Sequence, residues 1–235
     1  MINRINKFSA LILIIFSLNG IVFAQTEDQI LDFARAAKFN DVTTVKKLVS
    51  SGVSPNILDS KGELMLNLAI KDNSNEVISF LLTNQATDVD ISNQFGETPL
   101  MIASIDGNLP VVKALVQGRK AQLDHIGWTP LHYASSKGHL EVAQYLLANG
   151  AIVDSLSPGN TTPLMMAVQS GNEQLVKLLL DKGADIQLRN GNGLTAIDIA
   201  VIYEKPWIAE GLSSRWLKLY KKSYIYSKGV VPPKS

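Results

Sequence analysis

The sequence of 235 residues contains no cysteine, and this absence narrows the chemistry open to it. Disulfides, thiolate nucleophiles and cysteine-ligated metals are all excluded. A lipoprotein leader is excluded as well, because its cleavage site would need a cysteine. Any stability or activity of this protein must therefore come from non-covalent packing and from other side chains.

Motifs for catalysis and for phosphate binding are also missing. No G-x-S-x-G, H-E-x-x-H or paired-carboxylate pattern occurs, and the serines fall mostly where they would cap or turn a helix. The segment "GNG" at 191–193 lies in a turn and does not form a phosphate-binding loop. The sequence therefore predicts a protein that is not an enzyme and that holds no cofactor.

No apolar run reaches the roughly 20 residues that span a bilayer. The run "FSALILIIFSL" at 8–18 follows Arg4 and Lys7 and precedes "VFA" at 22–24, a pattern typical of a secretory signal peptide. We therefore expect residues 1–24 to be removed and the protein to be exported. Its location would be periplasmic if the host has an outer membrane, and secreted otherwise. The alternative is an uncleaved anchor that tethers the protein to a membrane.

Acidic residues are absent from the C-terminal segment, so the net charge of +1 hides an asymmetry. Residues 25–212 carry 14 Lys/Arg and 21 Asp/Glu, whereas residues 213–235 carry six Lys/Arg and no acid. An acidic body repels phosphate backbones. Nucleic acid is therefore not expected as a partner.

The sequence does contain a repeated unit, seen best in "GWTPLHYASSKGHLEVAQYLLANGA" at 127–151. Thr129 followed by Pro130 predicts a helix N-cap with proline in the first turn. Gly138 predicts the end of that helix, and a second apolar stripe over 140–147 predicts another helix. The equivalents of Thr129 lie at intervals of 33, 34, 31, 33 and 33 residues, and the full series is Leu31, Leu64, Thr98, Thr129, Thr162 and Thr195.

This period and the motif "TPLHYA" resemble the ankyrin repeat, whose 33-residue unit carries T-P-L-H-x-A. The resemblance covers about residues 27–212 in six copies, within a predicted domain at 25–212, and the first and last copies are atypical. It implies an all-α solenoid of stacked helix-turn-helix units with protruding hairpin-like loops. A one-residue insertion before Thr98 and a two-residue deletion before Thr129 should lie in these loops, where changes in length cost little.

The three histidines, His125, His132 and His139, are spaced by seven residues within one unit. The spacing suggests a metal site, but the stretch crosses a loop and two helices and offers no single helix face. In the family, the histidine of T-P-L-H typically hydrogen-bonds near the start of its helix, which is the role implied for His132. We therefore predict no metal site, although a histidine-ligated metal stays the alternative from another class of function.

Packing of the stack does not fix the residue type at three kinds of position: the loop tips, the residue just before Thr-Pro, and the open side of the first helix of each unit. The resemblance implies that such positions line a concave surface for a protein partner. Large apolar groups among them are typical of contact sites, although packing between neighbouring loops is the alternative for each one. The predicted partner-binding residues are Phe95, Glu97, Ile102, Asp106, His125, Ile126, Trp128, Tyr133, Lys137, Thr161, Met166 and Gln169.

The tail at 213–235, "SSRWLKLYKKSYIYSKGVVPPKS", continues an apolar stripe through Leu212, Trp216, Leu217 and Tyr220. This spacing predicts a helix that caps the last unit, followed by a flexible end. The competing interpretation is a basic aromatic patch for an acidic partner or a membrane surface. The sequence as a whole predicts a monomeric, exported, non-enzymatic protein-protein interaction module.

Overall fold

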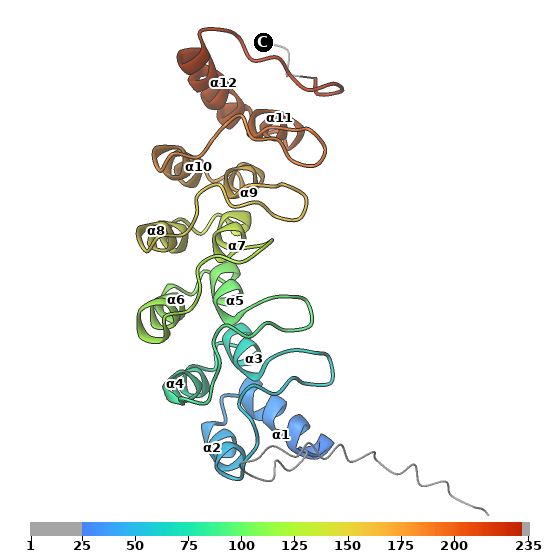
Figure 1. Cartoon of the computed structure of the whole chain (residues 1–235), viewed down its shortest axis with the longest axis vertical. Helices are drawn as coiled ribbons and strands as arrows, with labels where there is room; N and C mark the ends of the chain where they lie inside the picture. The colour runs from blue at the N-terminus through green and yellow to red at the C-terminus, as the bar shows by residue number, and fades with distance from the viewer. Residues whose placement is uncertain (1–24, 232–235) are drawn as a thin grey trace, which may run out of the picture.

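The computed structural model describes residues 25–231, in which helices follow one another in pairs along a stack (Figure 1). One helix of each pair lies beside the protruding loops and is called inner here, and its partner is called outer. The inner helices are α1 (Glu27–Lys38), α3 (Met65–Lys71), α5 (Pro99–Ile105), α7 (Pro130–Lys137), α9 (Pro163–Ser170) and α11 (Ala196–Ile202). The outer helices are α2 (Val42–Ser50), α4 (Asn75–Thr83), α6 (Leu109–Lys113) with the π-helical turn η1 (Ala114–Gly118), α8 (Leu140–Ala148), α10 (Glu173–Asp181) and α12 (Pro206–Tyr220).

A threonine at the repeat position sets the start of the four inner helices from α5 to α11. Its backbone is extended, and its hydroxyl oxygen accepts a hydrogen bond from the backbone N–H three residues later, which satisfies a donor that the helix leaves free. The four caps are Thr98, Thr129, Thr162 and Thr195. Gly138 ends α7 with a φ of 74°, a left-handed conformation that glycine adopts without strain.

Small residues allow successive inner helices to approach one another. An alanine recurs at one position of each inner helix and is buried in every case. These alanines are Ala36, Ala69, Ala103, Ala134, Ala167 and Ala200. The buried residues form one continuous hydrophobic cluster along the stack, so each unit completes its core against its neighbours. The predicted all-α solenoid is confirmed.

A polar side chain in each of four consecutive loops ties that loop to the next one. Each side-chain oxygen accepts a hydrogen bond from a backbone N–H of the following loop, at 2.8–3.2 Å. The accepting residues are Asn56, Asp90, Asp124 and Asp154. This loop ladder holds the protruding loops in register with the helices beneath them.

The two changes in repeat length have different structural outcomes. The insertion lies in the loop at 84–98, as predicted. The deletion shortens the loop at 119–129, but the preceding outer helix also continues through η1, so the helix end changes together with the loop. Arg119 follows η1 and donates to the carbonyls of Leu82, Asn84 and Thr87 at 2.6–3.1 Å, which anchors the new helix end on α4 and its loop.

The first inner helix begins earlier than its repeat position predicts. Leu31 is the equivalent of the threonine caps, yet it lies inside α1 and is 57% exposed. The cap is Thr26, which forms a capping box: its hydroxyl accepts from the backbone N–H of Gln29, and its own N–H donates to the Gln29 side chain. No unit precedes α1 among the described residues, so its first turns do not have to fit beneath an earlier loop.

The predicted boundary between residues 212 and 213 falls inside α12, so it does not separate two structural parts. This helix is the outer helix of the last pair, and its additional C-terminal turns cap the stack. Part of the end that was expected to be flexible is held in place, because Tyr224 and Ser227 donate hydrogen bonds to Asp198 of α11. Figure 1 shows this segment folding back over α11.

The predicted signal peptide at 1–24 lies outside the described residues. Between residues 25 and 231, no helix combines the length and the apolar character that a membrane crossing requires.

Candidate partner-binding site

The shortened loop at 119–129 leaves a hollow between its two neighbours. It projects less far than the loops before and after it (Figure 1). A recess of about 650 Å³ lies there, with Phe95 on the side of the preceding loop and Pro158 on the side of the following one. Trp128 and Tyr133 also line it. We call this hollow the loop recess.

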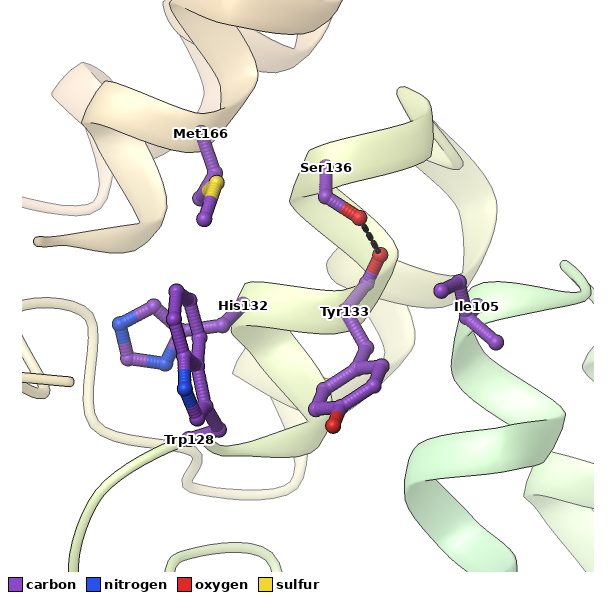
Figure 2. Close-up of a pocket in the computed structure, with 6 residues that line it drawn as sticks. All are labelled: Ile105, Trp128, His132, Tyr133, Ser136 and Met166. Carbon is purple, nitrogen blue, oxygen red and sulfur yellow. Dashed lines mark hydrogen bonds between the residues drawn. The ribbon is translucent and has the colours of Figure 1, made fainter. Parts of the chain in front are cut away.

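A smaller pocket of about 220 Å³ adjoins the loop recess and lies among three inner helices. In Figure 2, Trp128 lies across His132, and Met166 points toward both from α9. Ile105 of α5 lies on the far side of Tyr133. The complete lining is Ile105, Trp128, His132, Tyr133, Ser136 and Met166, and we call this hollow the helix pocket.

Trp128 and Tyr133 line both hollows and so join them into one cleft, which we call the central cleft. Trp128 is 39% exposed, and its ring meets the edge of the His132 ring with centroids 5.3 Å apart. Phe95, at the rim of the loop recess, is 69% exposed, and Ile126 beside it is fully exposed. The cleft therefore presents several large apolar groups to solvent within one small area.

His132 is locked in place beneath Trp128 by hydrogen bonds on both ring nitrogens. The backbone N–H of Thr129 donates to Nδ1 at 3.2 Å, and Nε2 lies 2.8 Å from the carbonyl oxygen of Thr161 in the next unit. A carbonyl only accepts, so Nε2 carries the proton and the ring is neutral. Burial lowers the pKa of His132 and favours the same neutral form. The local role that the resemblance implies for His132 agrees with these contacts, which also link two units.

Tyr133 is held by a chain of polar groups that crosses three units. Its hydroxyl donates to Glu97 at 3.2 Å, and Glu97 accepts from Asn93, which also donates to the buried Glu63. Burial, followed by the nearby Glu97 carboxylate, raises the pKa of Tyr133 to about 12. Burial alone would raise the pKa of Glu63, but hydrogen bonds led by that from Lys71 outweigh it and lower this pKa. The phenol is therefore a fixed, neutral hydrogen-bonding group.

The structure brings half of the predicted partner-binding residues together in the central cleft. These are Phe95, His125, Ile126, Trp128, Tyr133 and Met166, and Glu97 is bound to one of them. Four others, Asp106, Lys137, Thr161 and Gln169, do not line either hollow of the cleft. The expectation for Ile102 is wrong: it is only 2% exposed and belongs to the core between successive inner helices.

Sequence reasoning missed part of the lining. Ile105 and Pro158 close two sides of the cleft, and Asp90 and Asp124 of the loop ladder line the loop recess. The signal that could have located them is the two-residue deletion, because a short loop between two longer ones must expose the sides of both. Without that signal, each of these residues looks like an ordinary loop or helix-end position.

The histidines do not converge on a metal site. His132 uses both ring nitrogens in hydrogen bonds, and Nε2 of His139 lies 2.9 Å from the carbonyl oxygen of Ile105. Coordination of a metal would have to break these links between units. Within residues 25–231, no three histidine or acidic side chains form a group that could hold a metal ion.

Comparison with known proteins gives matches along most of the chain. A family model described as Ankyrin repeats (3 copies) matches residues 33–118, 84–157 and 152–219. The transient receptor potential cation channel subfamily A member 1 of Homo sapiens is 29% identical over 161 residues, which is 64% of this chain and 14% of that protein. The nuclear factor NF-kappa-B p105 subunit of Gallus gallus is 32% identical over 152 residues, 62% of this chain and 16% of that protein.

A third relative is matched over more of its length. The B-cell lymphoma 3 protein homolog of Mus musculus is 31% identical over 178 residues, which is 73% of this chain and 40% of that protein. The chain thus spans less than half the length of each of these relatives. The similarity concerns the repeats that they share with this chain, and their remaining segments have no counterpart in the aligned regions.

Proposed function

The chain belongs to the ankyrin repeat family, and from that membership we propose that it is a non-enzymatic module that holds a partner protein in the central cleft. Ankyrin repeats generally mediate protein-protein interaction, and the family is typically non-enzymatic. The observation that supports this site is the meeting of Trp128 and Tyr133 between two hollows, with Phe95 and Ile126 exposed at the rim. Tryptophan and tyrosine are among the residues most enriched at binding hot spots.

The cleft is also built to bind at low entropic cost. Tyr133 is held by Glu97, and Trp128 rests on a histidine that two units fix in place. The loop ladder joins the loops on either side of the recess through Asp90 and Asp124. A surface that is ordered before binding loses little conformational freedom on binding, so that more of the contact energy appears as affinity.

Export is part of the proposal. It is supported by the positive start, the apolar core at 8–18 and the small-x-small end at 22–24. N-terminal sequencing of the native protein tests it, with Gln25 expected as the first residue. A native chain that still begins before residue 24 would favour the membrane-tethered scaffold instead.

The binding site is tested by affinity capture from the exported fraction of the host. The wild type is compared with Trp128→Ala/Tyr133→Ala and with Trp207→Ala, a matched control that removes a 75% exposed tryptophan of α12 outside the cleft. The double variant should lose most of the proteins that the wild type captures, because hot-spot truncations cost about 2 kcal/mol or more each. The Trp207 control should retain them. Equal recovery by all three proteins would show that the central cleft is not the site.

A further inference from the structure

The two hollows of the central cleft differ in chemistry, and the difference describes what the partner must present. We infer that the cleft binds an extended segment of the partner in which one large apolar side chain is flanked by lysine or arginine. This inference rests on the proposed function and adds to it the chemistry of the bound segment. Three observations carry it: the size of the helix pocket, the charges of the loop recess, and the residues that the two hollows share.

The helix pocket fits a single apolar side chain. Its volume of about 220 Å³ lies below the roughly 300–1,000 Å³ of typical small-molecule sites. Its walls are the rings of Trp128 and Tyr133 with the side chains of Met166 and Ile105. The polar atoms of His132 are already committed to hydrogen bonds, so they offer little to a polar group that enters. Burial of a leucine-sized side chain here is favourable by the hydrophobic effect alone.

The loop recess favours a positive charge. Asp90 and Asp124 line it, and among the described lining residues there is no lysine or arginine. Each carboxylate accepts one backbone N–H of the next loop, which leaves further lone pairs free, since a carboxylate offers about four acceptor sites. Glu97, which accepts a hydrogen bond from the Tyr133 hydroxyl, adds a third carboxylate next to this shared wall of the cleft. The surrounding body at 25–212 is acidic too, with 21 Asp/Glu against 14 Lys/Arg.

The walls that the two hollows share place the apolar site of the helix pocket next to the site for a positive charge in the loop recess. Because Trp128 and Tyr133 line both hollows, a residue in the helix pocket and a residue in the loop recess are separated only by these two rings. Neighbouring side chains of one extended segment can satisfy both at once. An apolar anchor then supplies most of the affinity, and the carboxylates select a basic sequence around it and speed the encounter.

The loop ladder provides variants that separate charge from structure. Asp90→Asn/Asp124→Asn retains a side-chain oxygen to accept the backbone N–H and removes both charges. Asp154→Asn is the matched control, because Asp154 accepts the backbone N–H of Asp185 in the same way but does not line the cleft. Circular dichroism and thermal melts should show that both variants are folded like the wild type.

The experiment is selection from a displayed library of random linear 12-residue peptides against the full wild-type chain. Enriched peptides should carry lysine or arginine within two residues of a large apolar residue. In fluorescence anisotropy, Asp90→Asn/Asp124→Asn should bind an enriched peptide about tenfold more weakly at low salt, with a reduced salt dependence. Asp154→Asn should bind as the wild type does, and Trp128→Ala/Tyr133→Ala should not bind.

The outcomes separate this inference from the proposed function. Enriched peptides that are neutral or acidic, yet need Trp128 and Tyr133, would overturn the basic segment and leave the cleft as the binding site. A failure to enrich any peptide would overturn recognition of a linear segment, while the capture experiment decides on the cleft itself. Binding that is indifferent to both double variants would remove the cleft together with the inference. Self-association of the chain that the Asp90→Asn/Asp124→Asn variant abolishes would instead identify the basic tail of a second copy as the occupant.

Discussion

Trp216 is the residue whose loss should best expose how the C-terminal end of the stack is closed. Its ring lies partly buried against the core, with ring centroids 4.5 Å from Tyr220 and 4.9 Å from Tyr224. It thereby joins α12 to the segment that folds back over α11. Replacement by alanine removes this aromatic contact without touching the hydrogen bonds of Asp198.

The expected cost of Trp216→Ala is about 3 kcal/mol. A partly buried tryptophan withdraws about 150 Å² of apolar surface from water, which is worth about 4 kcal/mol at about 25 cal/mol per Å². Residual burial in the unfolded chain lowers this figure by about 10–40%. Lost ring pairing adds about 1 kcal/mol. The indole Nε1 is buried without a hydrogen-bond partner within residues 25–231, so its removal returns a desolvation cost of about 1 kcal/mol and cancels the loss of ring pairing.

Urea unfolding and hydrogen exchange together test this prediction. Trp207→Ala is the control on the same helix, because Trp207 is exposed and its loss should cost less than about 0.5 kcal/mol. A loss of about 3 kcal/mol lowers the melting temperature of a protein of this size by about 6–12 °C. Protection should fall most in α11 and α12 and fade toward α1, because each unit contacts only its neighbours.

Two results would refute the reasoning about Trp216. Equal stability losses for the two tryptophan variants would mean that the contacts with Tyr220 and Tyr224 contribute nothing. Unchanged protection of α11 and α12 in Trp216→Ala would mean that the end of the stack is closed by other groups, and the basic aromatic tail would then be free to act as a binding patch.

Two pH-dependent predictions concern Asp198 and His132, two buried groups that hydrogen-bond to the next part of the stack. Burial alone would raise the pKa of Asp198, but hydrogen bonds led by those from the backbone N–H groups of Ser227 and Thr195 lower it. A lowered folded-state pKa means that the charged form stabilises the fold above the unfolded value near 3.9, and that this contribution is lost as pH falls through the folded value. Asp198→Asn should therefore cost about 1–2 kcal/mol at pH 7, because hydrogen bonds to charged groups are the stronger ones. In urea titrations the difference from the wild type should shrink as pH falls below about 4, and a difference that stays constant would contradict this prediction. Burial lowers the pKa of His132, so its neutral form stabilises the fold above the unfolded value near 6.5, and this contribution is lost as pH falls below it. Between pH 7 and 5 the melting temperature of the wild type should fall more steeply than that of His132→Gln, and parallel curves would show that His132 does not titrate in this way.

The starts of the interior helices could be predicted from sequence because short-range chemistry decides them. Thr129 caps α7 through a bond to a residue three positions away, and Pro130 needs no partner for its absent N–H. The start of the first helix was predicted at the wrong residue, although the residues that set it are also close together in sequence. Thr26 and Gln29 form the pattern of a capping box, but alignment with the later units drew attention to Leu31 instead.

The closure of the C-terminal end could not be predicted from local patterns, because its contacts join distant residues. Asp198 stands three residues after Thr195, at the position that His132 holds after Thr129, and the local capping box accounts for its bond to the Thr195 backbone but not for its bonds to the tail. Where His132 donates to a carbonyl of the next unit, Asp198 accepts from Tyr224 and Ser227 of the returning tail. The tail thereby supplies hydrogen bonds at the last inner helix that a following unit supplies elsewhere.

The candidate site shows the same division between local pattern and packing. Ile102 and Tyr133 occupy the same position of their units, four residues after the capping threonine, yet Ile102 is buried and Tyr133 is partly open. Exposure at this position depends on the neighbouring unit, which a pattern within one unit does not describe. The large side chains of the cleft were visible in the sequence, whereas the hollow between them depends on the length of one loop relative to its neighbours.

That dependence explains why the cleft lies at the third to fifth units of an otherwise regular ladder. Residues that repeat, such as the capping threonines and the buried alanines, make every unit stack in the same way and so give no unit a distinct surface. The deletion before Thr129 breaks this uniformity while the core stays continuous, because Leu115 and Val116 of η1 remain buried and Arg119 anchors the altered helix end on α4. Restoring two residues to the loop at 119–129 would be expected to fill the recess while leaving the stack intact. On this reasoning, the irregularity of one loop sets the position of the cleft, and the regularity of the repeats keeps its walls rigid.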